Sequence, residues 1–263
     1  MTEPIYASGS EGYDELFARA TRLFIPTLLG AARVGPGLKV LDVATGTGAA
    51  ARMASDIVGA SGLVVGGDIS PTMLQAAQRN LKDLPIELRT LDGQSLPFAD
   101  ASFDGVICQL GLMFFPNPAR GLSEFRRVLR DGGRTAVSVT TTPERSLFAR
   151  VGAVTARHVP ARAEKLNRFF SIPDTDHLHR LVSGAGFSDV EVQSETRSIG
   201  FASFSAYFSG IEKGATLSGQ EFVQLAPDMR RLVRNEVREG LNAGDEGRPL
   251  TIDMEVLIGS GRR

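Results

Sequence analysis

The sequence has little of several residue types that build special sites. It contains one cysteine, no tryptophan and three histidines among its 263 residues. A lone cysteine, Cys108, excludes a disulfide framework and a cysteine-ligated metal site, so we expect no bound metal. The longest nearly apolar run, residues 23–32, is about half as long as a membrane span and contains Pro26. We therefore expect no membrane span.

An excess of either charge is also missing. The chain has 29 Lys and Arg against 30 Asp and Glu, which gives a formal net charge of −1. Because no window is strongly basic, a nucleic acid held by its phosphates is not expected as a partner. The N-terminal segment, MTEPIYASGSEGYDEL, is polar and acidic, unlike a signal or transit peptide. These features are typical of a soluble, cytoplasmic protein.

Up to about Thr140, runs suited to strands alternate with helical patterns. Strands are expected at residues 38–43, 62–66, 86–89, 103–108 and 135–139, the third nearer a sheet edge because its residues alternate. Helices are expected at residues 49–58, after Ser70-Pro71, and from Asn117-Pro118 to Leu129, with residues 130–133 ending the last. This alternation predicts an α/β fold with a doubly wound, mostly parallel sheet.

The pattern changes after Thr140. Helices are expected at residues 143–173, 174–186 and 199–244, and two further strands at residues 187–192 and 250–258. We predict a single domain over residues 1–263 with a seven-stranded Rossmann-like sheet. Its core would comprise residues 34–142, 174–198 and 247–263, and a helical cap would comprise residues 8–33, 143–173 and 199–246.

A glycine-rich loop follows the first predicted strand, in VLDVATGTGAA. The spacing Gly46-x-Gly48-x-x-Ala51 satisfies the dinucleotide-binding fingerprint, although a tight turn without a ligand would also use such glycines. Asp42, two residues before the loop, would repel a pyrophosphate at low dielectric. No lysine or arginine lies between Lys39 and Arg52 to compensate. A ligand with a positive centre, such as S-adenosylmethionine, is therefore favoured over NAD.

Two more carboxylates follow the next two predicted strands. Asp68, in GGDISP, is placed to accept hydrogen bonds from both ribose hydroxyls of an adenosine, as it would be in an NAD enzyme too. Asp92, in LDGQ, could accept a hydrogen bond from an adenine amino group, or it could be a turn aspartate. The sequence leaves these two interpretations of Asp92 equally open.

Four segments together resemble a known family. VLDVATGTG, GGDISPTML, LDGQSLPFADASFDGVICQLGLMFF and RRVLRDGG, between residues 40 and 139, resemble class I S-adenosylmethionine-dependent methyltransferases, most closely the ubiquinone/menaquinone-biosynthesis type. Ala44-Thr45 departs mildly from the family, which usually has a cysteine before its GTG. The resemblance implies S-adenosylmethionine as cofactor. It places Asp42, Ala44, Gly46 and Gly48 around the methionyl part, Asp68 on the ribose, Ile69 and Met73 against the adenine, Asp92 and Gly93 at the adenine edge, and Gln109 near the sulfonium.

No catalytic residue is assigned from the sequence. Alignment alone supplies about 7–11 kcal/mol to such a displacement, whereas a general base adds about 10²–10⁴-fold in rate. His177 and His179 are two residues apart and face different ways on a helix. His158 could overhang the pocket, but solvated or capping roles are favoured for all three histidines. A base is therefore not required, and none is predicted.

The segment after the fourth strand, residues 109–116, bears on the acceptor. It contains no acid or asparagine that could receive an amine, which favours a small, largely apolar acceptor such as a quinol-like ring, another aromatic or a polyketide. Alternatively, Met113 and Phe114 simply pack under the cap, and the two interpretations stand about even.

Two apolar helical stripes are expected in the cap. They are Phe201, Phe204, Tyr207 and Phe208, and Met229, Leu232, Val233 and Val237. Core packing is favoured over ligand contact for the first stripe, and both could roof the pocket or support a homodimer. Two rival functions remain at this point. One is a homologue that binds the cofactor but acts as a cyclase or regulator. The other is an NAD(P)-dependent oxidoreductase, against which the lack of a Tyr-x-x-x-Lys pair also argues.

Overall fold

A seven-stranded sheet forms the centre of the computed structural model, which describes residues 19–214, 216–244 and 247–263. The strands are β1 (Lys39–Val43), β2 (Leu63–Asp68), β3 (Ile86–Thr90), β4 (Phe103–Gln109), β5 (Leu129–Thr140), β6 (Ser188–Phe201) and β7 (Leu250–Arg262). Their order is β3-β2-β1-β4-β5-β7-β6, with β1 to β5 parallel and β7 antiparallel to both neighbours. The predicted α/β fold with a mostly parallel sheet is confirmed.

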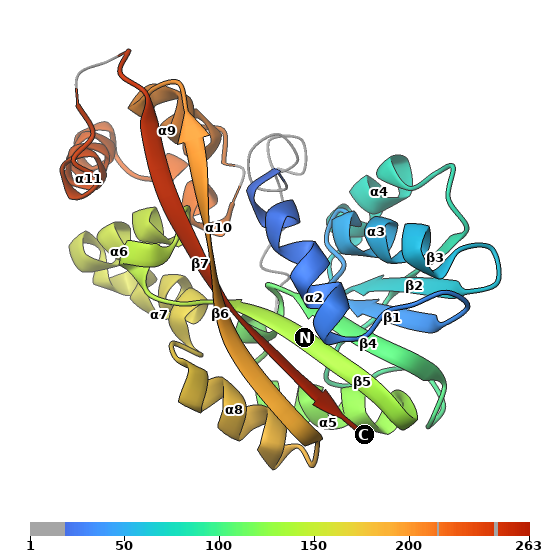
Figure 1. Ribbon diagram of the computed structural model, residues 1–263. Coiled ribbons are helices and arrows are strands. Elements are labelled where there is room, and N and C mark those ends of the chain that lie inside the picture. The colour runs from blue at the N-terminus through green and yellow to red at the C-terminus, as the bar shows by residue number, and fades with distance from the viewer. Residues whose placement is uncertain (1–18, 215, 245–246) are drawn as a thin grey trace.

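Helices cover both faces of the sheet. Figure 1 shows α3 and α4 on one side and α5 and α8 on the other. The helices that lie on the sheet are α2 (Ile25–Ala31), α3 (Ala49–Val58), α4 (Pro71–Asn80), α5 (Pro118–Val128) and α8 (Thr175–Gly184). The chain winds outward from β1 to β3 and then, in the opposite direction, from β4 to β5. Such a reversal places the ligand site of a doubly wound fold beyond the carboxyl ends of β1 and β4.

Side-chain caps start two of the helices that lead away from this edge, α4 and α5. The Ser70 hydroxyl accepts a hydrogen bond from the Met73 backbone N–H (3.3 Å), and the Asn117 side chain accepts one from the Arg120 N–H (3.0 Å). Each cap is followed by proline, whose missing N–H is not needed in the first turn. Both predicted helix starts are confirmed, and both fix where the chain leaves the sheet edge.

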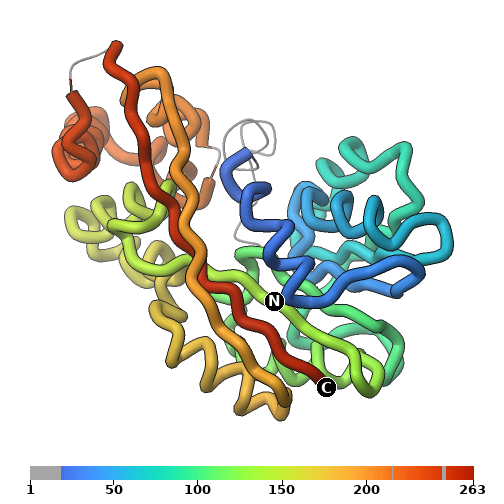
Figure 2. The backbone as a smooth tube through the Cα atoms, in the orientation of Figure 1, coloured from blue at the N-terminus to red at the C-terminus, as the bar shows by residue number. Residues whose placement is uncertain are grey.

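A second group of helices lies beyond the sheet. It consists of α6 (Ala149–His158), α7 (Ala163–Asn167), α9 (Phe204–Glu212), α10 (Leu217–Val223) and α11 (Pro227–Gly240). The helix α6 packs against α7, α10 and α11, and α10 packs against α9. We call these five helices the cap. Strands β6 and β7 reach it as a two-stranded ribbon, because β7 pairs with β5 only from Val256 onward but with β6 from Leu250 (Figures 1 and 2).

The first aromatic stripe is the core of the cap. Phe204, Tyr207 and Phe208 are buried, and the Tyr207 hydroxyl donates a hydrogen bond to the Leu147 carbonyl (2.6 Å). Phe201 lies edge-on to the Tyr207 ring at 5.4 Å. The core interpretation of this stripe is confirmed. In the second stripe Val233 and Val237 are buried, whereas Leu232 is exposed. Adjacent residues lie about 100° apart on a helix, which turns Leu232 away from the face that Val233 buries.

Several boundaries differ from the sequence-based expectation. The sequence pattern places Leu129 at the end of a helix, next to the apolar Val128. In the structure Leu129 instead pairs with Phe103 and begins β5. Residues 199–201 continue β6, where they pair with residues 250–252. The helix α2, within the expected cap segment 8–33, packs against β4, β5 and β7. In each case a partner distant in sequence determines the conformation or the position of the segment. Local periodicity carries no information about such partners. Residues 1–18 lie outside the described part of the chain.

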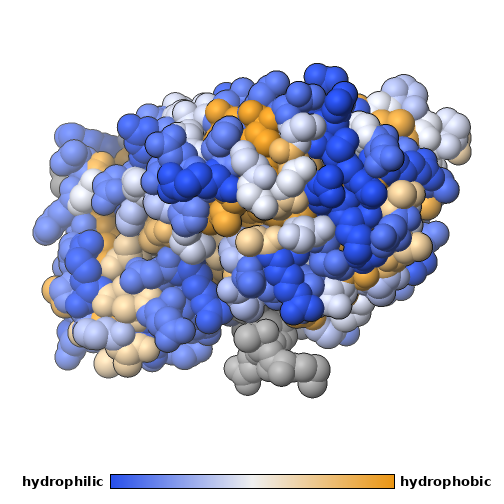
Figure 3. All heavy atoms as spheres, turned by 90° about the horizontal axis from the view of Figure 1, so that it is seen from below, coloured by the Kyte–Doolittle hydropathy of each residue, from blue (hydrophilic) through white to orange (hydrophobic). Residues whose placement is uncertain are grey.

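The outer surface is mixed in character. Figure 3 shows one face, on which apolar areas lie between hydrophilic ones. Single exposed apolar side chains such as Leu23 and Leu232 are normal for a globular protein and mark no interface by themselves. Within the described residues, no helix combines the length and the apolar character that crossing a bilayer requires.

A buried carboxylate links two cap helices. Glu221 on α10 is 7% exposed, and its oxygens accept hydrogen bonds from Arg162 Nη1 (2.8 Å) and Lys165 Nζ (2.6 Å). Removing one partner of a buried ion pair costs about 3–5 kcal/mol, because the remaining charge loses its compensation. Here both cations reach solvent, so a smaller cost is expected.

Replacing Glu221→Ala should lower the free energy of unfolding by about 2 kcal/mol, since charged hydrogen bonds contribute about 1.5–3 kcal/mol each and solvent screens part of the loss. Glu212→Ala is the matched control, because Glu212 is half exposed in its pair with Arg234. That control should cost less than about 1 kcal/mol. The chain lacks tryptophan, so urea unfolding is best followed by circular dichroism. Equal losses in the two variants would contradict the prediction.

Candidate active site

A cleft lies at the carboxyl ends of the strands, between the sheet and the cap. It encloses about 1230 Å³ of empty space, counting the part open to solvent. Eight of the ten predicted cofactor residues line it: Ala44, Gly46, Asp68, Ile69, Met73, Asp92, Gly93 and Gln109. Asp42 lines a smaller cavity that adjoins the cleft through Ala44, Gly46 and Gln109. Gly48 lines neither. The loops after β1, β2, β3 and β4 thus meet at one site.

The loop after β1 uses its two glycines differently. Gly46 has a φ of +57°, and a Cβ built on it would meet nothing within 4 Å. Gly48 has a φ of +91°, and its Cβ would lie 2.5 Å from Leu81 Cδ1. Only glycine adopts such angles without strain. Gly46 therefore lets the backbone approach the open cleft, whereas Gly48 lets helix α3 pack closely against Leu81.

Asp42 is fully buried beneath this loop. Its Oδ2 accepts a hydrogen bond from the Thr45 hydroxyl (2.7 Å), and its Oδ1 has no hydrogen-bond partner. Burial away from water raises the pKa of Asp42 from 3.8 to about 7, and the nearby negative charge of Asp68 adds to the rise. A buried carboxylate oxygen without a partner is costly. A cationic or hydrogen-bond-donating ligand group reaching the adjoining cavity would compensate it.

Asp68 joins the loops after β1 and β2. Its Oδ2 accepts a hydrogen bond from the Gly46 N–H (2.9 Å), and its Oδ1 accepts one from the Ser70 N–H (2.8 Å). Burial raises the pKa of Asp68, and these backbone hydrogen bonds oppose the rise. An ionised carboxylate has about four acceptor sites. Asp68 can therefore hold the two loops together and still accept hydrogen bonds from a ligand in the cleft.

Asp92 forms a turn and also lines the cleft. Its Oδ1 accepts a hydrogen bond from the Gln94 N–H (2.8 Å), which confirms the turn interpretation. The side chain remains exposed at the cleft, so this turn does not exclude a ligand contact. The next residue, Gly93, has to be small, because a Cβ there would lie 2.4 Å from Phe115 Cζ.

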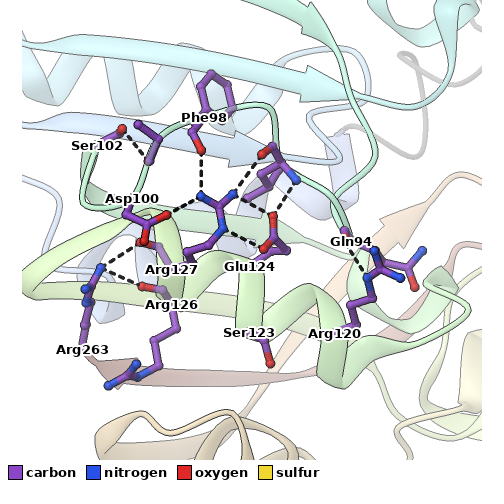
Figure 4. A network of polar contacts seen from close by, with 12 residues as sticks. Gln94, Phe98, Asp100, Ser102, Arg120, Ser123, Glu124, Arg126, Arg127 and Arg263 are labelled. Atoms are coloured by element: carbon purple, nitrogen blue, oxygen red, sulfur yellow. Dashed lines mark hydrogen bonds and ion pairs between the residues drawn. The ribbon is translucent and has the colours of Figure 1, made fainter.

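A polar network behind this turn fixes it to α5 (Figure 4). Arg120 Nε donates to the Gln94 carbonyl (2.9 Å), and the Asn117 N–H donates to Gln94 Oε1 (2.8 Å). Arg127 pairs with Glu124 and holds the pKa of that carboxyl below its usual range. Arg127 also donates to Asp100 and to the carbonyls of Leu96 and Phe98. The motif RRVLRDGG contains Arg127, but sequence reasoning gave this residue no role.

Gln109 lies at the end of β4 and contacts the N-terminal part of the chain. Its Nε2 donates a hydrogen bond to the Thr21 carbonyl (2.8 Å). Thr21 also lines the small cavity beside Asp42. The amide of Gln109 therefore holds residues just before α2 against the site, a contact that sequence spacing could not indicate.

The opposite end of the cleft is apolar. Its walls are made by Met113, Phe114, Phe148, Phe169 and Met254, with Arg168 beside them. Phe114 meets Phe169 edge-on at 5.0 Å, and Phe148 stacks on the buried ring of Tyr207 at 6.4 Å. Of these residues, sequence reasoning named only Met113 and Phe114. The others come from helical segments and from β7, where periodicity does not tell which buried side chain faces a cavity.

None of the three histidines lines the cleft. His158 Nε2 lies 2.6 Å from Glu236 Oε2, between α6 and α11, and this contact lowers the pKa of Glu236. His177 and His179 lie on α8, which packs on β6 and β7. The expected solvated role fits His179, which is exposed, whereas His158 pairs with Glu236, a role that was not expected. Among the described residues, the charged side chains that line the cleft are Asp68, Asp92 and Arg168.

Comparisons with known proteins agree with this geometry. A family model described as a methyltransferase domain matches residues 41–137. A demethylmenaquinone methyltransferase of Staphylococcus saprophyticus is 34% identical over 176 residues, which cover 62% of this chain and 76% of the relative. The chain belongs to the class I S-adenosylmethionine-dependent methyltransferases. It is a methyltransferase whose cofactor is S-adenosylmethionine, and the rival assignment to NAD(P)-dependent oxidoreductases does not hold.

Solved structures show how widely this fold is used. The methyltransferase resembles the YcgJ protein of Bacillus subtilis, with a TM-score of 0.59 and 16% identity, covering 94% of this chain and 99% of that one. It also resembles the cyclase SpnF, with a TM-score of 0.56 and 17% identity, covering 95% and 83%. At these identities the likeness shows the fold alone.

The departure of this methyltransferase from the family loop has a structural consequence. Ala44 has a φ of +57°, although it carries a Cβ, and a Cβ on Gly111 would lie 2.5 Å from that of Ala44. Thr45 stands where the family usually has cysteine. Its hydroxyl donates a hydrogen bond to the Asp42 carboxylate. The loop therefore keeps a strained backbone and gives Asp42 its one side-chain hydrogen bond.

Asp42 should make the methyltransferase less stable as the pH rises. Because its pKa rises from 3.8 to about 7 on folding, the folded protein keeps a proton that the unfolded chain releases between these values. The free energy of unfolding falls over this interval and levels off above about pH 7. The amide of Asp42→Asn does not titrate, so its free energy of unfolding does not fall in this way. The variant should therefore be more stable than the wild type at pH 8, by up to about 4 kcal/mol.

Urea unfolding at pH 4, 6 and 8 measures this difference. The advantage of Asp42→Asn should shrink toward zero near pH 4. Asp56→Asn, on the exposed side of α3, is the matched control and should show no such trend. A pH-independent difference between Asp42→Asn and the wild type would contradict burial as the cause.

Proposed function

We propose that this methyltransferase methylates a small, largely apolar molecule of the quinol or related aromatic type. The observation that carries the proposal is the apolar end of the cleft, where Phe114, Phe148, Phe169 and two methionines form the wall. Among the described residues, no histidine lines the cleft, and its carboxylates lie at the end of β2 and in the loop after β3. Within the same part of the chain, no carboxylate lines the apolar end to hold a charged amine. The demethylmenaquinone methyltransferases among the relatives are named for a quinone-type acceptor, which supports the same class here.

The end of the cleft away from the apolar wall, at the loops after β1 to β3, suits the cofactor. The cofactor supplies a methyl group on a positively charged sulfur. We propose that the cofactor residues take the roles that the family resemblance implies: Asp42, Ala44, Gly46 and Gly48 at the methionyl part, Asp68 at the ribose, Ile69 and Met73 at the adenine faces, Asp92 and Gly93 at the adenine edge, and Gln109 near the sulfur. Three observations support the fit. Asp42 Oδ1 lacks a partner, Gly46 leaves open space, and Ile69 is 46% exposed at the cleft.

Alignment of the two reactants is the contribution that these residues make to the reaction. Holding two reactants in line supplies about 7–11 kcal/mol. The cap wall, built on the buried ring of Tyr207, gives the acceptor side a fixed shape. Phe169 is held by its backbone, because its carbonyl accepts a hydrogen bond from the Thr140 hydroxyl at the end of β5. A general base is not needed in this account.

Location in the cytoplasm, formation of a homodimer and the absence of a nucleic-acid partner stay predictions of the sequence. The rival of a cyclase or regulator that binds the cofactor without methyl transfer keeps the same cofactor end. Only the fate of the methyl group separates this rival from the proposed reaction.

Incubation of the protein with labelled S-adenosylmethionine and naphthalene-1,4-diol should yield S-adenosylhomocysteine and a methylated derivative of the diol. Phosphoethanolamine, an amine acceptor of similar size, is the comparison and should yield neither. Transfer to the amine but not to the diol would contradict the proposed acceptor class. Tight cofactor binding without any transfer to a panel of phenols, naphthols and quinols would favour the cyclase or regulator.

Asp68→Ala should weaken binding of S-adenosylhomocysteine about a hundredfold or more, because two charged hydrogen bonds of about 1.5–3 kcal/mol each would be lost. Isothermal calorimetry measures the affinity, and circular dichroism shows whether the loops still fold without the carboxylate. Asp56→Ala removes the same charge from an exposed position on α3 and should bind as the wild type does. An unchanged affinity of a folded Asp68→Ala variant would refute the placement of the ribose.

A further inference from the structure

The apolar end of the cleft contains one charge. Arg168 lines the cleft beside Met113, Phe114 and Phe169, and it is the cationic side chain that does so among the residues the structure describes. The two carboxylates of the cleft are at the proposed cofactor end: Asp68 is the last residue of β2, and Asp92 follows β3. The Arg168 side chain is 37% exposed, so solvent reaches its charge. Mostly apolar ligand sites carry a small number of polar or charged groups that orient the ligand, and Arg168 is in the position of such a group.

The backbone that carries Arg168 is fixed to the sheet. The Thr140 hydroxyl donates to the carbonyl of Phe169, and the Ser171 hydroxyl donates to the Met113 carbonyl (2.9 Å). The Phe169 ring, 3% exposed, also lies against Phe114. Arg168 is therefore attached to a segment that is tied to β5 and to the turn after β4, and its position at the cleft does not depend on a free loop.

The charge of Arg168 is not used inside the protein. Its ion-pair partner is Glu164, whose Oε1 lies 3.8 Å away and whose side chain is 93% exposed. Such a solvated pair contributes about 0–1 kcal/mol. Arg162 and Arg145, by contrast, pair with the buried carboxylates of Glu221 and Glu255. Arg168 thus differs from these structural arginines, since it reaches a ligand cavity with its hydrogen-bonding capacity largely available.

We propose that Arg168 binds an ionised oxygen of the acceptor, so that the acceptor is an apolar ring bearing an acidic hydroxyl, methylated as its phenolate. This inference rests on the proposed function and narrows its acceptor class. An arginine offers two parallel N–H donors to one oxygen or to a pair of oxygens, and it keeps its charge at all accessible pH values. An opposite charge within about 4–6 Å lowers the pKa of an acid by about 1–3 units.

This arrangement explains how methyl transfer proceeds without a general base in the apolar end. The hydroxyl proton leaves to water, and Arg168 stabilises the resulting phenolate. An electron pair of the phenolate, at oxygen or at the adjacent ring carbon, forms the bond to the methyl carbon as the carbon–sulfur bond breaks. The bonding pair of that bond stays on sulfur, which becomes a neutral thioether. Where carbon is methylated, the ring carbon then releases its hydrogen as a proton to solvent, and the aromatic ring is restored.

The test uses 4-nitrophenol as the probe, because its anion absorbs at a longer wavelength than the neutral form. The protein is first saturated with S-adenosylhomocysteine. The pH at which half of the bound probe is ionised is then compared in the wild type, Arg168→Gln and Arg168→Lys. We expect the wild-type value to lie about 1 unit or more below that of Arg168→Gln, with Arg168→Lys between them. Arg180→Gln, on the exposed side of α8, is the matched control and should behave as the wild type does.

A second measurement separates acceptor binding from cofactor binding. The affinity for S-adenosylhomocysteine should be the same in the wild type and in Arg168→Gln, and so should the affinity for 4-nitroanisole, which has no ionisable hydroxyl. A weaker affinity of Arg168→Gln for S-adenosylhomocysteine would overturn the inference, since Arg168 would then serve the cofactor.

The remaining outcomes distinguish the role of Arg168 from the proposed acceptor class. Equal ionisation of the bound probe in the wild type and Arg168→Gln would overturn the role of Arg168 but leave the aromatic acceptor class standing. Failure of the wild type to bind either nitrophenol or nitroanisole, while it binds S-adenosylhomocysteine, would overturn the acceptor class and the inference with it.

Discussion

The carboxylate of Asp68 is the group on which the geometry of the site depends. It accepts one hydrogen bond from the loop after β1, at Gly46, and one from the start of α4, at Ser70. The parallel sheet brings these two loops to the same edge, and the carboxylate then fixes the distance between them. The open space at Gly46 and the exposed side chain of Ile69 are both held in place by this bridge. A group that serves the fold in this way also remains able to accept hydrogen bonds from a ligand.

Asp42 shows the cost of preparing such a site. The carboxylate is fully buried, one oxygen has no partner, and its pKa is raised to about 7. Hydrophobic packing at this position would stabilise the fold better, as it often does when a buried charge is replaced. The strained backbone of Ala44 lies beside it. Destabilising features gathered at one loop are typical of a site arranged for a ligand rather than for stability.

The two ends of the cleft are built by different means. The proposed cofactor end comes from consecutive strand–loop–helix units, and short-range caps and turns position its residues. The proposed acceptor end brings Phe148 and Phe169 together with Met254, which lies far along the chain on β7. The β6–β7 ribbon carries α9, α10 and α11 out over the sheet, and the aromatic core around Tyr207 supports the wall. If the two ends serve as proposed, changes in the cap can alter the acceptor without altering the cofactor end, which suits a fold that serves many substrates.

The sequence by itself determined the sheet, the helix starts and the family, because these depend on local signals. Ser70-Pro71 and Asn117-Pro118 are capping pairs, the strands are short apolar runs, and the four motifs lie in order between residues 40 and 139. Tertiary structure alone decided three further features: the unpaired oxygen of Asp42, the contact of Gln109 with Thr21, and the place of Arg168 beside Phe169. Each of these depends on a partner, or on open space, that is contributed by a distant segment. Periodicity reports which side chains are buried, but it does not report whether a buried side chain meets another side chain or a cavity.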